Sequence, residues 1–160
     1  MLPIDIESDD YRFYKTLNED VQIKPVTPTA QHWDIQMENG DYVNVTGFES
    51  LHNAICIAIM TRFNELDFIP LYEGFGCRVH ELVKANKSEM VKYKVELFTE
   101  EVLENMRRIE SVNSVRASED NSHSYLIEFN VTSISDEIIT GSVVIWIMLK
   151  KIMKKYLKLY

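Results

Sequence analysis

The period of the apolar residues changes near Val112, and that change limits the fold more than any other feature. Between Thr46 and Ile109, apolar residues recur every three or four positions, as they do on one face of a helix. After Val112, they alternate with polar residues, as they do in strands that bury one face. Helices followed by a run of strands are typical of the α+β class, and 160 residues with 46% hydrophobic content suffice for one domain.

Three strands are predicted in the alternating part of the sequence, with polar turns between them. In the middle strand, Tyr125, Ile127, Phe129 and Val131 share one face. Because short polar turns join consecutive strands, the sheet should be an antiparallel meander with one solvated face. The strands are Val112–Ala117, Ser124–Ile134 and Ile139–Leu149, and the turns are Glu119–Ser122 and Ser135–Glu137.

Two to three helices are predicted before these strands. Thr46 and Glu49 have the spacing of a capping box, in which a hydroxyl and a carboxylate accept hydrogen bonds from free N–H groups. A buried, central helix should therefore begin there and fade near Asn64. The other helices are predicted over Cys77–Ala85 and from a Ser88 cap to about Ile109.

The sequence before the helices indicates a hairpin preceded by an arm. Asn39-Gly40 lies between two apolar runs, and both residues tolerate the positive φ angles of a type I′ turn, which predicts a hairpin over Trp33–Val45. Residues 1–30 contain three of the four prolines and no sustained period, which favours an extended arm lying along another surface. The predicted organisation is an arm at 1–30, one α+β domain at 31–149 and a basic tail at 150–160.

The charge of the chain disfavours two classes of partner. A net charge of −8 and a pI near 5.0 oppose binding to nucleic acid or to an anionic membrane. The acidic start of the sequence is unlike a signal peptide, and the longest apolar run is far too short to span a bilayer. The two cysteines lie in apolar segments of a chain that needs no disulfide. These features predict a soluble protein of cytoplasmic type.

The tail at residues 150–160, called the lysine tail below, reverses this charge. It has five lysines and no acid, which leaves 12 basic and 25 acidic side chains, a net charge of −13, in residues 1–149. Apolar residues are interspersed with the lysines, so the lysine tail could form a helix with one apolar side. Such a helix would either pack on its own domain or dock on an acidic partner.

Four soft metal ligands occur in pairs at helical spacing. His52 and Cys56 are four residues apart and Cys77 and His80 are three apart, so together they could supply a tetrahedral zinc site. Buried cysteines are more often small core residues, and a core of this size needs no metal. We therefore expect no metal and no cofactor, and a zinc-binding adaptor is kept as an alternative.

Three carboxylates raise a second alternative. Glu65, Asp67 and Glu73 lie among aromatic and apolar residues and superficially resemble the acid pair of a glycosidase. Carboxylates in such a loop more often cap helices or pair with a base. The sequence contains no phosphate-binding glycine loop, zinc-protease motif or nucleophile elbow. We therefore predict no catalytic residue and no enzyme, with a lysozyme-like hydrolase as the alternative.

Several residues from the first helix to Gly76 resemble a family motif. They are, in order, Gly47, Thr61-Arg62, Glu65, Pro70 and Phe75-Gly76. In these residues, and in the long helix and meander that follow, the chain is similar to the baseplate wedge proteins of contractile phage tails. Those proteins initiate the sheath and were formerly labelled lysozyme-like. The resemblance covers about Val43–Ile147, and an acid stands where the family's Glu-Pro-Arg-like signature has arginine.

The resemblance implies a structural protein, present in six copies in the tail baseplate of a virion assembled in the host cytoplasm, or at the base of a related injection device. It implies a fold similar to the C-terminal domain of tail sheath proteins, with strand edges to which the first sheath ring adds its own strands. The implied partners are the sheath subunit and other wedge proteins, with the tail tube as a further candidate. The candidate protein-contact residues are Arg62, Glu65, Pro70, Phe75, Gly76, Ile139, Val143 and Ile145.

Overall fold

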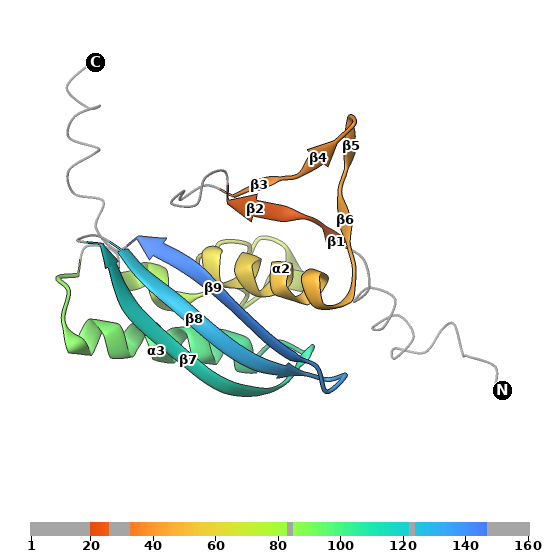
Figure 1. Ribbon diagram of the computed structural model, residues 1–160. Coiled ribbons are helices and arrows are strands. Elements are labelled where there is room, and N and C mark those ends of the chain that lie inside the picture. Colours follow the sequence, from red (N-terminus) through yellow and green to blue (C-terminus); the bar gives the residue numbers. More distant parts are fainter. Residues whose placement is uncertain (1–19, 26–32, 83–84, 122–123, 147–160) are drawn as a thin grey trace, which may run out of the picture. The chain divides into compact units, whose positions relative to one another are not determined.

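The computed structural model describes residues 20–25, 33–82, 85–121 and 124–146 of the chain. These residues fall into two compact units that divide between Ala54 and Ile55, and Figure 1 shows the elements of each. Most of the predicted arm, and all of the lysine tail, lie outside the described residues. The predicted division into arm, domain and tail therefore stays a prediction.

The first unit is built from three short antiparallel ribbons that meet at one junction (Figure 1). At the junction, three backbone hydrogen bonds form a closed ring. The Gln22 N–H donates to the Val43 carbonyl (2.8 Å), the Val43 N–H donates to the Gln36 carbonyl (3.1 Å), and the Gln36 N–H donates to the Gln22 carbonyl (2.9 Å). The ring satisfies these amides where the ribbons part. The ribbons pair β1 (Asp20–Val21) with β6 (Asn44–Val45), β2 (Ile23–Pro25) with β3 (Trp33–Ile35), and β4 (Met37–Glu38) with β5 (Asp41–Tyr42).

The predicted hairpin is present but shorter than expected. Asn39 (φ 53°) and Gly40 (φ 85°) form the turn between β4 and β5, with the positive φ angles that a type I′ turn requires. Met37 pairs with Tyr42, which continues the hairpin as predicted. The strand before it, β3, pairs instead with β2, because residues from the end of the predicted arm supply its backbone partners.

The helix predicted to begin at Thr46 is present as α2 (Gly47–Met60). Ile55 and Ile59 on this helix are fully buried, as expected for a helix that contributes to a core. It ends at Met60 rather than near Asn64, because the Thr61 carbonyl and the Phe63 N–H bond to the backbone of Cys77 instead of continuing the helix.

The long helix predicted after Ser88 is α3 (Glu89–Glu104). The Ser88 hydroxyl accepts a hydrogen bond from the Val91 N–H at 3.2 Å, which confirms the predicted cap. The helix stops short of the predicted end near Ile109. Two 3₁₀ turns precede it, η1 (Pro70–Tyr72) and η2 (Arg78–Leu82), and η2 lies within the predicted Cys77–Ala85 helix. None of the described helices is long and apolar enough to cross a membrane.

The sheet of the second unit is the predicted antiparallel meander, in the order β7-β8-β9, and the α+β class is confirmed. Tyr125, Ile127, Phe129 and Val131 are buried on one face of the middle strand, as predicted. Helix α3 packs against β7 and β8, which explains the need for an apolar face (Figure 1). The strands are β7 (Ile109–Asn121), β8 (Ser124–Ser133) and β9 (Ile138–Trp146), so β7 is longer than predicted.

Candidate functional site

The loop between α2 and η2, which carries five predicted contact residues, is closed at its base by the backbone. The Cys77 N–H donates to the Thr61 carbonyl (2.8 Å) and the Phe63 N–H donates to the Cys77 carbonyl (3.2 Å). Gly76 lets the two chain segments approach: its φ is +104°, and a Cβ atom there would collide with the Arg62 carbonyl. Only glycine fits, so Gly76 has a structural role in this loop.

Three other predicted contact residues shape the same loop. The Glu65 carboxylate accepts a hydrogen bond from the Arg62 N–H at 3.1 Å, and the Glu65 N–H donates to the Arg62 carbonyl at 3.0 Å. Pro70 begins η1, where a missing N–H costs no helical hydrogen bond. All three residues are exposed, so a partner could reach them. Their predicted contact with another protein stays a prediction.

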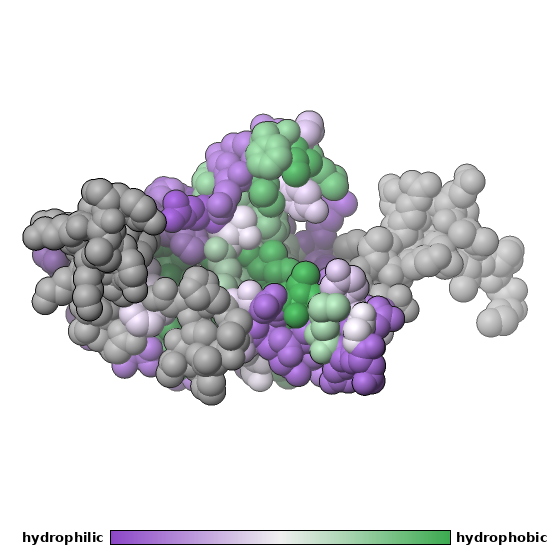
Figure 2. Space-filling model, turned by 90° about the horizontal axis from the view of Figure 1, so that it is seen from above, coloured by the Kyte–Doolittle hydropathy of each residue, from purple (hydrophilic) through white to green (hydrophobic). Residues whose placement is uncertain are grey.

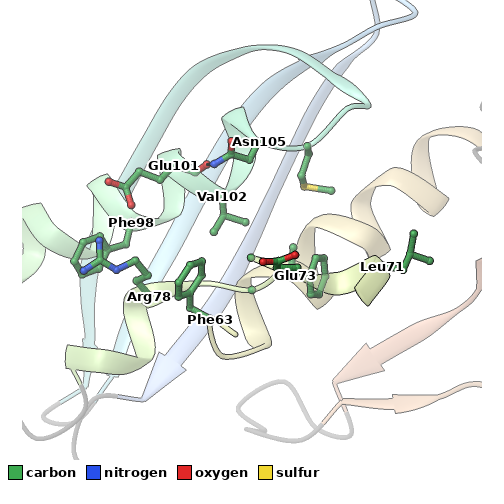
Figure 3. A pocket seen from close by; sticks show the side chains of 13 residues that line it. Phe63, Leu71, Glu73, Arg78, Phe98, Glu101, Val102 and Asn105 are labelled. Carbon is green, nitrogen blue, oxygen red and sulfur yellow. Dashed lines mark hydrogen bonds between the residues drawn. The ribbon is translucent and has the colours of Figure 1, made fainter. Parts of the chain in front are cut away.

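Beside this loop the second unit has a groove with a volume of about 510 Å³ (Figure 3). Its walls come from the end of α2, from the loop and from the second half of α3. Phe75 and Gly76 of the predicted contact set line it, together with Phe63, Leu71 and Val102. Leu71 is 85% exposed, so the groove presents apolar surface that the described residues do not cover.

The groove also carries two carboxylates and one arginine. The Arg78 guanidinium donates to both carboxylate oxygens of Glu81, at 3.1 and 3.2 Å, and lies 4.6 Å from the centre of the Phe98 ring. The hydrogen bonds that Arg78 donates to Glu81 raise the pKa of Arg78 further, so the arginine stays charged and paired. Glu73 and Glu101 form no ion pair within the described residues. The groove therefore combines apolar surface with two carboxylates and one guanidinium, and Glu101 also interacts electrostatically with Arg78.

The loop exposes further large apolar side chains. Phe68 is 78% exposed, and Ile69 and Tyr72 are also exposed, in addition to Phe63 and Leu71. The space-filling view in Figure 2 shows hydrophobic residues at the surface among hydrophilic ones. Exposed apolar residues that cluster in this way often mark a surface for binding another segment of protein.

The four residues of the zinc hypothesis are not arranged as a metal site. Burial raises the pKa of Cys56 to about 12 and that of Cys77 to about 11, so both thiols stay protonated at neutral pH. Burial lowers the pKa of both His52 and His80, and Nε2 of His80 lies 3.1 Å from the Ile59 carbonyl oxygen. In the described parts of the chain, no group of three or more His, Cys, Asp or Glu side chains could hold a metal ion.

The three carboxylates of the hydrolase hypothesis are all exposed. Glu65 is engaged by the Arg62 amide, Glu73 lines the groove, and Asp67 lies in the loop between them. The general acid of a glycosidase usually depends on an apolar, buried environment. The surroundings of these residues are therefore those of loop carboxylates.

Among the described residues, β9 is an edge strand, and its register shows which of its backbone groups bond to β8. The Ser133 N–H donates to the Glu137 carbonyl at 2.9 Å, and the register with β8 then continues without a shift along all nine residues of β9. In an antiparallel pair, the N–H and C=O of one residue point to the same side. The odd-numbered residues of β9 therefore bond to β8, while Thr140, Ser142 and Val144 direct their backbone groups to the outer edge.

The predicted contact residues Ile139, Val143 and Ile145 are odd-numbered members of this strand. Their side chains are 1%, 1% and 4% exposed, so they belong to the core, and their backbone groups face β8. Any strand added at this edge would bond to the backbone of their even-numbered neighbours, and the predicted contact of the three residues with another protein stays a prediction. Alternation marks the odd positions as buried, but the register of the turn, which directs the hydrogen bonds, is not visible in the sequence.

The opposite edge of the sheet, β7, is partly closed. The Ala117 N–H points away from β8 and donates to the carboxylate of Glu96 on α3 at 2.9 Å. Three register shifts interrupt the pairing of β7 with β8, and such bulges bend an edge and hinder strand addition. Near the end of β7, Lys87 forms an ion pair with Glu119 at 3.3 Å.

One comparison with known proteins bears on this fold. A crystal structure of a protein from Geobacter sulfurreducens, provisionally named a tail lysozyme, is similar with a TM-score of 0.54 and 22% sequence identity. The match covers 62% of this chain and 89% of that one, and it shows a shared fold. No protein-family model matches the sequence, and no curated protein matches it either.

Proposed function

We propose that this chain is a structural component of a contractile tail, a baseplate wedge protein on which the sheath begins to assemble. Two observations support this class of protein. The fold is shared with a protein that is provisionally named a tail lysozyme. The residues from Gly47 to Gly76 also resemble the motif of the sheath-initiating wedge family.

The observation that carries the proposed mechanism is the regular outer edge of β9. Within the described residues, β9 pairs with β8 alone, and its register has no shift. A sheath subunit would supply an extended strand that bonds to the backbone of Thr140, Ser142 and Val144. The contact uses backbone groups, so it needs an open edge more than particular side chains. No covalent bond changes, and the role requires no enzyme activity.

The loop between α2 and η2 is the second contact surface in this proposal. Its exposed apolar residues, including Phe68 and Leu71, suit the burial of a neighbouring wedge protein, and Arg62, Glu65 and Phe75 lie in the same loop. The tail tube is a further candidate partner. In this arrangement six copies surround the baseplate of a virion that is assembled in the host cytoplasm.

Nucleation of sheath polymerisation tests the β9 mechanism. The full chain, mixed with the sheath subunit of the same contractile tail, should nucleate ordered sheath that electron microscopy can count. Ser142→Pro removes an outward N–H and places a ring at the edge, so nucleation should fall roughly 10-fold or more. Ser142→Ala shortens the same side chain, retains the amide and should nucleate normally. A folded Ser142→Pro chain that nucleates as well as the unmodified chain would overturn the mechanism.

The provisional name of the similar structure favours testing a lysozyme-like alternative. If that alternative is correct, the unmodified chain cleaves peptidoglycan. Glu65→Gln then abolishes cleavage while assembly remains intact. Glutamine keeps an acceptor for the Arg62 amide, so the loop should keep its shape. The structural proposal expects no release of reducing sugars by either protein. Release by the unmodified chain alone would establish the hydrolase instead.

A further inference from the structure

We infer that three aspartates, Asp20, Asp34 and Asp41, prevent other copies of this chain from adding strands to the ribbons of the first unit. Each carboxylate lies at the outer edge of one of the three chain segments that form the ribbons. This role belongs to the first unit alone, so it goes beyond the proposed part of β9 in sheath assembly and does not depend on it. The three segments are residues 20–25, 33–38 and 41–45.

The ring of hydrogen bonds at the junction shows which backbone groups of the ribbons point outward. Gln22, Gln36 and Val43 each donate one bond and accept one bond within the ring, so both backbone groups of each residue point inward. Along a strand of an antiparallel pair, this direction alternates from one residue to the next. The residues beside them therefore direct their N–H and C=O groups to the outer edges. Three of these outward-pointing residues are Val21, Ile35 and Tyr42.

Each of these three outward amides donates a hydrogen bond to the carboxylate of the aspartate that precedes it. All three bonds are 2.8 Å long, and the same contact occurs once on each segment. An amide that is bonded to its own neighbour is less available to a strand from another molecule. The pairs are the Val21 N–H with Asp20 Oδ1, the Ile35 N–H with Asp34 Oδ1, and the Tyr42 N–H with Asp41 Oδ1.

The ribbons have the properties of segments that pair with copies of themselves. Ile35, Met37 and Tyr42 are 48%, 58% and 57% exposed, and Met37 lies directly opposite Tyr42 across the hairpin. Short ribbons with exposed apolar side chains and free edges are templates for strand addition. A two-stranded ribbon is also marginally stable by itself, so an added strand would stabilise it. Without some protection, copies of the chain should associate at these edges.

A carboxylate at the edge opposes strand addition in two ways. The carbonyl of an incoming strand would have to displace a carboxylate that accepts a stronger, charge-assisted hydrogen bond from the same amide. The displaced carboxylate would then lose water as the strands close around it. A second copy also brings its own three aspartates to the contact, and each chain has a net charge of −8. Another copy of this chain is therefore the strand donor that these residues oppose most.

The proposed contact strand of the second unit lacks this protection. Thr140, Ser142 and Val144 direct their backbone groups outward from β9, and the residue before each of them is isoleucine, glycine or valine. No preceding carboxylate can therefore accept a hydrogen bond from these amides. The aspartate contact thus distinguishes the ribbons of the first unit from β9.

Sedimentation velocity of full-length variants measures self-association and tests this role. Replacing the three aspartates with alanine removes the acceptors, so the association constant should rise about 10-fold or more. Replacing them with asparagine removes the same charges but keeps an oxygen acceptor, so this variant should associate at least about 3-fold more weakly than the alanine variant. The control removes three negative charges at exposed positions of the second unit and should stay within about 2-fold of the unmodified chain. Its substitutions are Glu100→Ala, Glu104→Ala and Glu110→Ala.

Amide exchange measured by NMR locates the contact. In the alanine variant, exchange at Ile35 and Tyr42 should slow as protein concentration rises, while exchange at Ser142 of β9 should not change. A folded alanine variant that associates no more than the asparagine variant or the charge control would overturn the inference. So would protection that appears at Ser142 instead. If the triple variant does not fold, Asp34→Ala with Asp34→Asn as its control gives the same comparison at the Ile35 amide.

Discussion

The two edges of the sheet in the second unit differ in the regularity of their strands and in the hydrogen bonding of their outward-pointing backbone groups. On β7, the outward amide of Ala117 is bonded to Glu96 of α3, and three register shifts distort the strand. On β9, nine residues pair with β8 without a shift, and the outward groups have no strand beside them within the described residues. Among the described residues, the outer edge of β9 is therefore regular and that of β7 is not.

A sheet with two regular open edges would invite pairing with copies of itself. Closing β7 with a carboxylate and with bulges leaves β9 as the regular edge among the described residues. The apolar residues do not distinguish the two edges, because both belong to strands with the same buried face. The following substitutions test whether the edges are as different as their hydrogen bonds indicate.

The largest effect is expected at the centre of the sheet, which both edges share. Ile127 is fully buried in β8, so Ile127→Ala should lower the free energy of unfolding by about 2–5 kcal/mol. Urea denaturation followed by circular dichroism measures this loss. Strands β7 and β9 should both be destabilised, and the variants that affect one edge are compared with this result. A loss below about 1 kcal/mol would mean that β8 is not the common support of the two edges.

A smaller effect is expected on the closed edge. Glu96→Ala leaves the buried amide of Ala117 without its partner, which should cost about 1–3 kcal/mol in unfolding free energy. Glu96→Gln retains an oxygen acceptor and should cost less. Amide exchange at Ala117 should accelerate in the alanine variant while exchange at Val143 stays slow. If both variants exchange at the unmodified rate, Glu96 does not close this edge.

Much of the sheet could be predicted from the sequence because alternation is a local signal. Apolar residues at every second position located β8 and its buried face, and the Ser88 cap and the Asn39-Gly40 turn were found from short-range chemistry. These features depend on residues close together in the chain.

The features that the sequence did not predict depend on distant residues. The β7 edge is closed by Glu96, which lies 21 positions from Ala117, and no local pattern in either segment predicts the hydrogen bond between them. The ring of Gln22, Gln36 and Val43 joins segments without a periodic signal. Which residues of β9 direct their backbone groups outward depends on the register of the turn before it. The first two are tertiary hydrogen bonds, which local propensity does not encode, and the third is a backbone hydrogen bond within a turn, which the alternation of apolar residues does not reveal.

The smallest effect is expected on the open edge, where two adjacent residues make a matched pair. Ser142→Pro removes an N–H that points outward, so the free energy of unfolding should change by less than about 1 kcal/mol. Gly141→Pro removes an N–H that bonds toward Phe129 of β8, so it should cost about 2–3 kcal/mol. Urea denaturation of the two variants gives the difference directly.

This pair tests the phase of β9 independently of any partner. If Gly141→Pro were the tolerated substitution and Ser142→Pro the costly one, the odd-numbered residues would face outward. The β9 edge would then present Ile139, Val143 and Ile145, the residues first predicted from the sequence, to an added strand. Equal and large costs would mean that β9 is covered on both sides, which would remove the difference between the two edges of the sheet. The expected order follows from a single bond, the Ser133 amide to the Glu137 carbonyl, which sets the direction of every later bond in the strand.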